Sequence, residues 1–315
     1  MIRVENLSKN YGPVKAVRSI SFDLDDGQVV GFLGANGAGK STTLKIMTGY
    51  ISPSSGNVYF NDQNIHDNTS EIQKDIGYLP ELNPLYGEMR VHDYLKFISE
   101  IRGIPKENFK SAFQKVVEEC ALNAVAHRTI GNCSKGYKQR IGLAAAMIHD
   151  PKILILDEPV TGLDPNQIVE IRQLIRKLGK EKIVIMSSHI LQEIQATVDR
   201  IIIINEGSIV ADGSSDSLLS DTNAKTELSM DVENADENDI KDMKAKIPSI
   251  DITSISKEDT YTKINIKYPK NNDPRSDIFN YAVDKGWTIL EMFATKQKLE
   301  DLFRNLTSSS ESNDG

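Results

Sequence analysis

The stretch Gly34-Ala35-Asn36-Gly37-Ala38-Gly39-Lys40-Ser41-Thr42, directly after the apolar run Val29–Leu33, decides the fold of this chain. It fits the pattern GxxxxGK[ST], whose glycines let backbone N–H groups curl around a triphosphate. Lys40 would reach the terminal phosphates and Ser41 would offer its hydroxyl to Mg²⁺. The anion would lie at the start of a helix expected over 42–48, where unpaired N–H groups favour negative charge. The alternative is a glycine-rich turn without a ligand, but the strand before the loop and the helix after it favour a nucleotide-binding loop.

The composition is that of an ordinary globular protein. The chain has 315 residues, of which 39% are apolar and 26% charged, so it can form one large domain or two smaller ones. Cys120 and Cys133 are too few for a metal site or a disulfide framework, which indicates a reducing compartment. The sequence shows neither a signal peptide nor an apolar run long enough to cross a bilayer. Any role at a membrane would therefore need a membrane-spanning partner.

The net charge of −8 is unevenly distributed along the chain. Residues 221–315 hold 19 acidic and 13 basic side chains, and no tract of the sequence is strongly basic. Such a chain lacks the positive charge that attracts a phosphate backbone. The composition therefore argues against direct binding of nucleic acid.

Two adjacent carboxylates, Asp157 and Glu158, follow the apolar run 152–156, which is typical of a strand buried on both faces. Successive side chains of a strand point in opposite directions, so the two carboxylates can have different roles. Asp157 is expected to hold Mg²⁺ through water, and Glu158 to orient the attacking water as general base. The alternative is a solvated acidic turn. A further strand over 183–187 would place His189 at the carboxyl edge of the sheet, where ligands of α/β proteins bind, and both a structural and a catalytic role stay open for it.

The remaining elements follow from periodicity and turn residues. Short strands are expected over 2–4, 17–24 and 76–79, and helices over 91–101 and 108–122. Ser134 is the expected N-cap of a third helix that runs to Ile148. Tyr11 stands in a turn well ahead of the phosphate loop, where its ring would either stack on a base or simply pack.

The order of these motifs resembles that of ABC-type ATPases, over residues 1 to about 217. The resemblance rests on Tyr11, the loop at 34–42, Glu81, Ser134-Lys135-Gly136, Asp157-Glu158, Gly162-Leu163-Asp164-Pro165 and His189. It implies an α/β fold: a P-loop, RecA-like ATPase core with antiparallel β and α-helical subdomains, the helical one over about 88–150. It also implies that ATP and Mg²⁺ are the cofactors.

The same resemblance assigns roles to single residues. Tyr11 would stack on the base, His189 would contact the γ-phosphate, and Asp164 would face the opposite subunit. Two copies would close head to tail, with Ser134 and Gly136 of one capping the ATP held by the other. The ATP-binding set is expected to comprise Tyr11, Gly34, Asn36, Gly37, Ala38, Gly39, Lys40, Ser41, Thr42, Ser134, Gly136 and Asp164, the catalytic set Lys40, Glu158 and His189, and the metal ligands Ser41, Glu81 and Asp157.

Two positions depart from the usual family pattern. Glu81 stands where the family has glutamine, and a carboxylate serves Mg²⁺ at least as well but adds negative charge beside the triphosphate. The usual Leu-Ser-Gly-Gly-Gln is here Cys133-Ser134-Lys135-Gly136-Tyr137. Lys135 would either bring positive charge to ATP or point to solvent. With the segments 80–86 and 134–140, these departures resemble the ATP-binding subunit of gliding-motility-associated ABC exporters.

That resemblance implies a separate transmembrane permease as partner. The stretch 82–91 lies where such subunits receive a cytoplasmic helix of the permease. The chain would then be cytoplasmic and peripheral on the inner face of the cell membrane, working as a homodimer without direct nucleic acid binding. Export of a drug, lipid or polysaccharide is the alternative to a role in gliding.

Residues 218–306 have a different character. Their segments suit a small βαββαβ module, like a ferredoxin-like split unit. It resembles the C-terminal domain of many exporter subunits, which implies a role in pairing or regulating the two copies. In the last helix Leu299, Leu302, Phe303 and Leu306 share one face, which favours core packing over a partner site. Residues 307–315 are expected to be disordered.

Two other classes of ABC ATPase fit less well. Those acting on ribosomes usually carry two nucleotide domains in tandem, whereas this sequence has one. Those maintaining chromosomes carry a long coiled coil between the phosphate loop and Ser134, and the segment here is short and lacks sustained heptads. The sequence therefore favours the ATPase subunit of an exporter.

Overall fold

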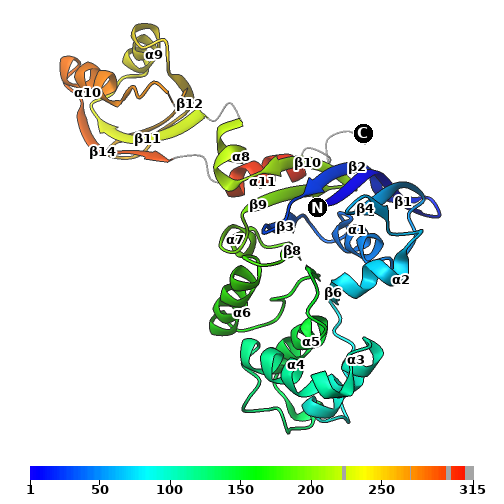
Figure 1. The fold of residues 1–315 in the computed structure, drawn as a ribbon. Coiled ribbons are helices and arrows are strands. Elements are labelled where there is room, and N and C mark those ends of the chain that lie inside the picture. The colour runs from blue at the N-terminus through cyan, green and yellow to red at the C-terminus, as the bar shows by residue number, and fades with distance from the viewer. Residues whose placement is uncertain (222–224, 270, 296–298, 309–315) are drawn as a thin grey trace. The chain divides into compact units, whose positions relative to one another are not determined.

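The computed structural model describes residues 1–221, 225–269, 271–295 and 299–308 (Figure 1). It divides into two compact units. The first comprises Met1–Ser215 together with the chain end from Leu306, and the second comprises Asp216–Asn305. Within the described ranges, no helix combines the length and the apolarity needed to cross a membrane.

The first unit is built on a six-stranded sheet with the order β10-β9-β3-β8-β7-β6. Neighbouring strands from β9 to β6 are parallel, and β10 is antiparallel to β9. All residues of β3, β7 and β8 are buried, as expected for parallel strands covered on both faces. The strands are β3 (Val29–Leu33), β6 (Ile76–Leu79), β7 (Ile153–Leu156), β8 (Ile183–Ser188), β9 (Arg200–Asn205) and β10 (Ser208–Gly213).

A second, antiparallel sheet of the first unit has the order β2-β1-β4-β5. Its strands are β1 (Ile2–Tyr11), β2 (Val14–Leu24), β4 (Ser55–Phe60) and β5 (Gln63–Asn64), so the first two strands are longer than predicted. Leu44, Ile46 and Met47 of helix α1 (Lys40–Met47) belong to one buried cluster with residues of both sheets. The phosphate-loop helix is therefore fixed between the two sheets.

The segment between β6 and β7 is helical. It contains α3 (Val91–Ile101), α4 (Lys106–Glu119), the 3₁₀ helix η2 (Ile130–Asn132) and α5 (Lys135–Met147). Ser134 caps α5 as predicted, because its hydroxyl accepts a hydrogen bond from the Tyr137 amide. The other helices of the first unit are α2 (Thr69–Ile72), the 3₁₀ helix η1 (Gln73–Asp75), α6 (Pro165–Leu178) and α7 (Leu191–Gln195).

The second unit has the βαββαβ order predicted from the sequence. Its sheet is antiparallel with the order β12-β13-β11-β14, the arrangement of a ferredoxin-like split unit. Apolar residues of its strands and of α9 and α10 form a separate core. The elements are α8 (Ser215–Asp221), β11 (Lys225–Glu233), α9 (Glu237–Lys246), β12 (Asp251–Lys257), β13 (Thr262–Pro269), α10 (Arg275–Asp284), β14 (Thr288–Thr295) and α11 (Leu299–Ser308).

The chain end corrects one prediction. Thr307 and Ser308, expected to be disordered, lie in α11. The helix extends this far because the side chain of Asn205 donates a hydrogen bond to the Leu306 carbonyl, 3.3 Å away, which ties the last turn to β9. Leu299 and Leu302 are buried, as the apolar stripe predicted. The rest of the expected disordered tail, 309–315, lies outside the described residues.

Candidate functional site

The phosphate loop connects β3 to α1. Gly39 takes a left-handed conformation, with φ of 107°, and caps the helix, which therefore begins at Lys40, two residues earlier than predicted. A Cβ atom at Gly39 would lie 2.5 Å from the Ala16 carbonyl oxygen, so only glycine fits there. Among the described residues, the amides at 37 and 39–42 have no hydrogen-bond partner. The loop thus presents a row of free N–H groups at a helix N-terminus, which is an anion-binding arrangement.

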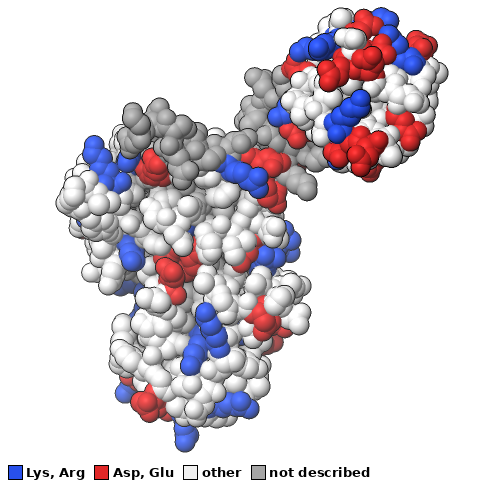
Figure 2. Space-filling model, turned by 180° about the vertical axis from the view of Figure 1, so that it is seen from behind, with Lys and Arg blue, Asp and Glu red and all other residues white. Residues whose placement is uncertain are grey.

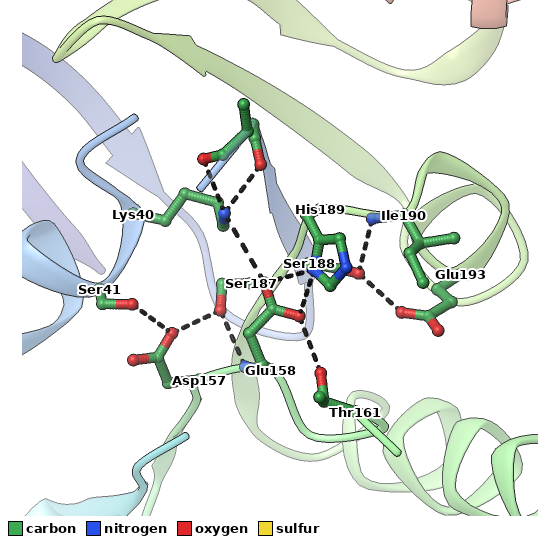
Figure 3. Close-up of polar contacts among 12 residues, drawn as sticks. Lys40, Ser41, Asp157, Glu158, Thr161, Ser187, Ser188, His189, Ile190 and Glu193 are labelled. Atoms are coloured by element: carbon green, nitrogen blue, oxygen red, sulfur yellow. Dashed lines mark hydrogen bonds and ion pairs between the residues drawn. The ribbon is translucent and has the colours of Figure 1, made fainter. Parts of the chain in front are cut away.

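The Lys40 side chain lies inside this loop and is only 5% exposed. Its ammonium donates hydrogen bonds to the carbonyls of Gly34 (2.8 Å) and Ala35 (3.2 Å). It also lies 3.6 Å from a carboxylate oxygen of Glu158 (Figure 3). The cation is therefore held at the loop by its own backbone and by the second carboxylate of the acidic pair.

Asp157 follows β7 and contacts the phosphate-loop helix. The Ser41 hydroxyl donates to its Oδ1 atom over 3.0 Å (Figure 3), and the Asp157 amide donates to the Leu79 carbonyl at the end of β6. A hydroxyl and a carboxylate so close together are oxygen donors of the kind that Mg²⁺ prefers. Because Mg²⁺ usually keeps substrate phosphates and water as its other ligands, this pair fits a magnesium site that nucleotide completes.

Glu158 and His189 form a second pair. The Nδ1 atom of His189 lies 3.0 and 3.1 Å from the two carboxylate oxygens of Glu158, and the Thr161 hydroxyl donates to Oε2 over 3.1 Å (Figure 3). The Glu158 side chain is buried, whereas that of His189 is 40% exposed. Glu158 also has a positive φ of 51°, which is uncommon for a residue other than glycine. The structure thus brings Lys40, Ser41, Asp157, Glu158 and His189 together.

Several polar residues of this network were not identified from the sequence. The Ser187 hydroxyl lies between Asp157 and Glu158, and the Ser188 hydroxyl donates to the buried carboxylate of Glu193 over 2.6 Å. Ser188 also accepts a hydrogen bond from the Ile190 amide. The only sequence signal was the position of the two serines, directly before His189 and after a run of apolar strand residues.

Glu81 is exposed and has no hydrogen bond or ion pair to Ser41 or Asp157 among the described contacts. Glu81 does lie close enough to Tyr78 to act on it electrostatically. Burial raises the pKa of the Tyr78 hydroxyl well above its usual range, and the charges of Asp157 and Glu81 raise it further. Both carboxylates thus lie near one phenol, but the described residues contain no cluster of three metal-binding side chains.

The residues expected to act across the dimer lie apart from this network. Ser134 and Asp164 cap α5 and α6, respectively, and Gly136 packs against the Gln167 side chain. Tyr11, at the end of β1, is 49% exposed, and the Lys9 ammonium lies 5.3 Å from the centre of its ring. Within the described part of the chain, no hydrogen bond or ion pair joins Ser134, Asp164 or Tyr11 to the phosphate loop.

Lys135 has a partner within its own chain. Its side chain lies against Gly162, where a Cβ atom would collide with the ammonium. Gly162 has a left-handed backbone with φ of 72° and directly precedes Leu163 and Asp164. Lys135 is exposed, as the second sequence alternative expected, and its ammonium lies beside the segment before α6, which the sequence did not indicate.

Comparison with known proteins agrees with this site. The family model described as ABC transporter (ABC_tran) matches residues 17–161. The chain is 34% identical over 313 residues to YhcH of Bacillus subtilis, an ABC transporter ATP-binding protein, covering 98% of this chain and 96% of that protein. It is 31% identical over 308 residues, 98% of each chain, to the linearmycin resistance ATP-binding protein LnrL of the same organism. The bacitracin transport ATP-binding protein BcrA of Bacillus licheniformis is 40% identical over 212 residues, 67% of this chain and 68% of that protein.

Solved structures show the same fold for the first unit. An ATP-binding subunit of an ABC transporter superimposes with a TM-score of 0.64 at 27% identity, covering 70% of this chain and 92% of that one. An ATP-binding cassette of an ABC transporter in its ADP conformation superimposes with a TM-score of 0.63 at 27% identity, covering 70% of this chain and 95% of that one. The α/β P-loop fold predicted from the sequence is therefore confirmed. The chain belongs to the ATP-binding subunits of ABC transporters and is an ATPase of that family.

Proposed function

We propose that this ATPase powers an exporter, as a head-to-tail dimer of two chains with two ATP molecules between them. The observation that carries the proposal is the network of Lys40, Ser41, Asp157, Glu158 and His189 around one phosphate-binding loop. In it, Glu158 acts as general base for the attacking water. His189 contacts the γ-phosphate, and Lys40 and the free loop amides hold the terminal phosphates.

Magnesium is part of the proposal. Ser41 and Asp157 would hold Mg²⁺, with Glu81 as a further ligand once nucleotide brings it close. The ion would neutralise charge on the β- and γ-phosphates. The chain's own residues do the rest: the loop amides orient the triphosphate, and Glu158 accepts the proton of the attacking water at its carboxylate.

The proposed dimer is supported by motif residues that lie apart from their own phosphate loop. In the part of the chain that the structure describes, Ser134, Gly136 and Asp164 have no hydrogen bond or ion pair to their own phosphate loop. A helix N-terminus with a serine hydroxyl is suited to an anion, so we infer that these groups cap the ATP bound by a second copy. Tyr11 is exposed at the end of β1 and would stack on the base.

A groove of the first unit is the proposed contact for a transmembrane permease. It has a volume of about 670 Å³ and lies between the β6 edge of the sheet and the helices α3 and α5. Tyr50 and Ile101 on its rim are 73% and 63% exposed, and nearby Leu82 is 85% exposed. Exposed apolar side chains around a groove mark an interaction site. A permease docked there would place the chain at the inner face of the membrane.

The second unit, 218–306 by sequence, would pair or regulate the two copies. On the face drawn in Figure 2, lysines and arginines are scattered among acidic and uncharged residues rather than gathered into a basic patch. On this face, neither unit offers the basic patch that would attract a phosphate backbone.

Two candidates for the exported substance have support. The sequence motifs at 80–86 and 134–140 support gliding machinery, which remains a prediction because none of the relatives above bears such a name. The relatives named for bacitracin transport and linearmycin resistance support the alternative, export of a drug. The full-length match to the resistance protein is the observation that favours this second candidate.

The experiment that tests the proposal is purification of the full chain from gently solubilised native membranes, with and without ATP. Stoichiometric recovery of a multi-span polypeptide is expected. Substitution Ile101→Glu in the groove should abolish that recovery, and Phe279→Glu, at a 55% exposed site of the second unit, should leave it intact. Deletion of the gene should then sensitise cells to bacitracin or linearmycin if the cargo is a drug, or stop surface movement if it is motility machinery. Recovery of the chain only with ribosomes or DNA would contradict the proposal.

A further inference from the structure

The hydroxyl of Ser187 connects the two carboxylate residues of the site. Ser187 lies near the end of β8 and is completely buried. Its hydroxyl donates a hydrogen bond to Asp157 Oδ1 over 2.6 Å and accepts one from the Glu158 amide over 2.9 Å (Figure 3). Because a serine hydroxyl has a single proton, its donor is fully used by Asp157. One small side chain thus contacts both members of the acidic pair.

The Glu158 amide depends on this hydroxyl. The parallel ladder between β7 and β8 ends at the pair Leu156 and Met186, so Glu158 lies beyond the last pairing. Its positive φ of 51° turns the backbone away from the strand. A buried N–H group without an acceptor is costly, and the Ser187 oxygen is the acceptor. The hydroxyl therefore replaces the ladder hydrogen bond at the residue where the chain turns.

The Asp157 carboxylate is oriented from two sides. Its Oδ1 atom accepts hydrogen bonds from Ser41 on α1 and from Ser187 on β8. Among the described residues, the Ser187 hydroxyl makes no hydrogen bond to the phosphate loop. A change at Ser187 therefore acts first on the two carboxylates, and it removes neither of the hydrogen bonds that hold Lys40 to the loop carbonyls.

We propose that Ser187 is a positioning residue for ATP hydrolysis, whose hydroxyl fixes Glu158 relative to Asp157. The inference rests on the proposed role of Glu158 as general base. Without the hydroxyl, the Glu158 amide loses its acceptor and the strained turn relaxes, so the carboxylate leaves the position from which it orients water. A misplacement of about 1 Å can cost about a hundredfold in rate, whereas the loop amides and the hydrogen bonds of Lys40 to the loop do not involve Ser187.

The test uses the purified full chain and separates turnover from binding. For Ser187→Ala we expect kcat to fall about tenfold to a hundredfold, while KM and the equilibrium Kd for ATP stay within about threefold of the wild type. Ser187→Thr keeps the hydroxyl and should recover most of the rate. Ser187→Cys, with a weaker donor, should lie between them and gives a second comparison if the threonine methyl does not fit. The matched control is Ser99→Ala, because Ser99 is equally buried but its hydroxyl bonds only to the Lys96 carbonyl of its own helix.

A double mutant gives a readout that loss of stability would not produce. In a Glu158→Gln background, Ser187→Ala should lower the residual rate by less than about twofold, because the group that it positions has already lost its chemistry. The inference is overturned if Ser187→Ala keeps wild-type kcat, if its Kd rises in proportion to the loss of kcat, or if the loss is equally large without Glu158. Normal turnover of Glu158→Gln alone would instead overturn the role proposed for Glu158.

Discussion

The ammonium of Lys40 lies 3.6 Å from the carboxylate of Glu158, and both side chains are almost completely buried. Two opposite charges at this distance inside a protein compensate each other, and removing one leaves the other uncompensated. The cation proposed to hold phosphate and the carboxylate proposed to orient water are thus electrostatically coupled. A substitution at either residue therefore also changes the electrostatic surroundings of the other.

Substitution Glu158→Gln should keep ATP binding but lower turnover by at least about a hundredfold, because the amide cannot accept the proton of the attacking water. The variant should accumulate as an ATP-bound dimer, measurable by light scattering coupled to size-exclusion chromatography. Glu181→Gln makes the same chemical change at an exposed site and serves as control. Undiminished hydrolysis would remove Glu158 from the mechanism.

Substitution Lys40→Ala should raise the Kd for ATP by at least about tenfold, because a charge-assisted contact to the terminal phosphates is lost. Titration calorimetry with ATP would measure this. Lys45→Ala, on the same helix but away from the loop, should bind ATP like the wild type. Equal affinities of the two variants would show that Lys40 does not contact the triphosphate.

Substitution Tyr11→Ala should weaken ATP binding about tenfold, and Tyr11→Phe should bind normally, since stacking needs a ring and not a hydroxyl. Competition with inorganic triphosphate, which has no base, provides the discriminating measurement: its affinity should be the same in all three proteins. Tyr50→Ala, at another exposed tyrosine, is the control. A weaker affinity for triphosphate in Tyr11→Ala would indicate damage to the loop instead of lost stacking.

The lowered pKa of His149 makes the stability of the fold depend on pH. Burial, reinforced by the charge of Arg102, lowers its pKa to about 4, while Nε2 lies 3.1 Å from the Ile76 carbonyl. The unfolded chain has a histidine pKa of about 6.5, so between these values the unfolded state binds more protons than the folded one. This contribution to stability is therefore present above about pH 6.5 and is lost as the pH falls towards 4.

Urea unfolding at pH 7 and pH 4.5 would test this dependence. His149→Gln should lose less stability between the two pH values than the wild type, whereas His66→Gln, at an exposed site, should lose as much. Carboxylates contribute equally to the pH dependence of stability in all three proteins, so the comparison isolates the contribution of His149. An unchanged pH difference in His149→Gln would contradict the assignment.

Gly77 allows β6 and α5 to pack closely. A Cβ atom there would collide with the Ala146 carbonyl of α5. Gly77→Ala should therefore destabilise the fold by about 1–3 kcal/mol, the usual cost of overpacking, measured as a lower midpoint of urea unfolding. Gly87→Ala is the control, since its Cβ would meet nothing nearer than 3.9 Å. Equal midpoints would show that α5 moves away without cost.

The sequence predicted what depends on local pattern. The phosphate loop, Asp157, Glu158 and His189 follow buried strands, and apolar runs and glycines mark them clearly. Ser187, Thr161 and Glu193 could not be predicted, because a hydroxyl or carboxylate takes its role from partners far away in the chain. The contact of the Lys135 ammonium with Gly162 likewise depends on how the start of α5 lies against the segment before α6. The start of α3 and the Ser134 cap of α5 were predicted correctly, whereas α1 and α4 begin two residues earlier than predicted. A helix start depends on backbone conformation, as at Gly39, which the sequence pattern does not fix to the residue.

The contact between Asn205 and Leu306 has a consequence for shortening the chain. The second unit leaves the first at Ser215, and the chain returns to it at Leu306. Topologically, the second unit is an insertion and not an appendage. A stop codon at position 216 would therefore also delete the final turn that accepts the Asn205 hydrogen bond. Excising 216–305 and rejoining the ends is the deletion that would keep the first unit whole.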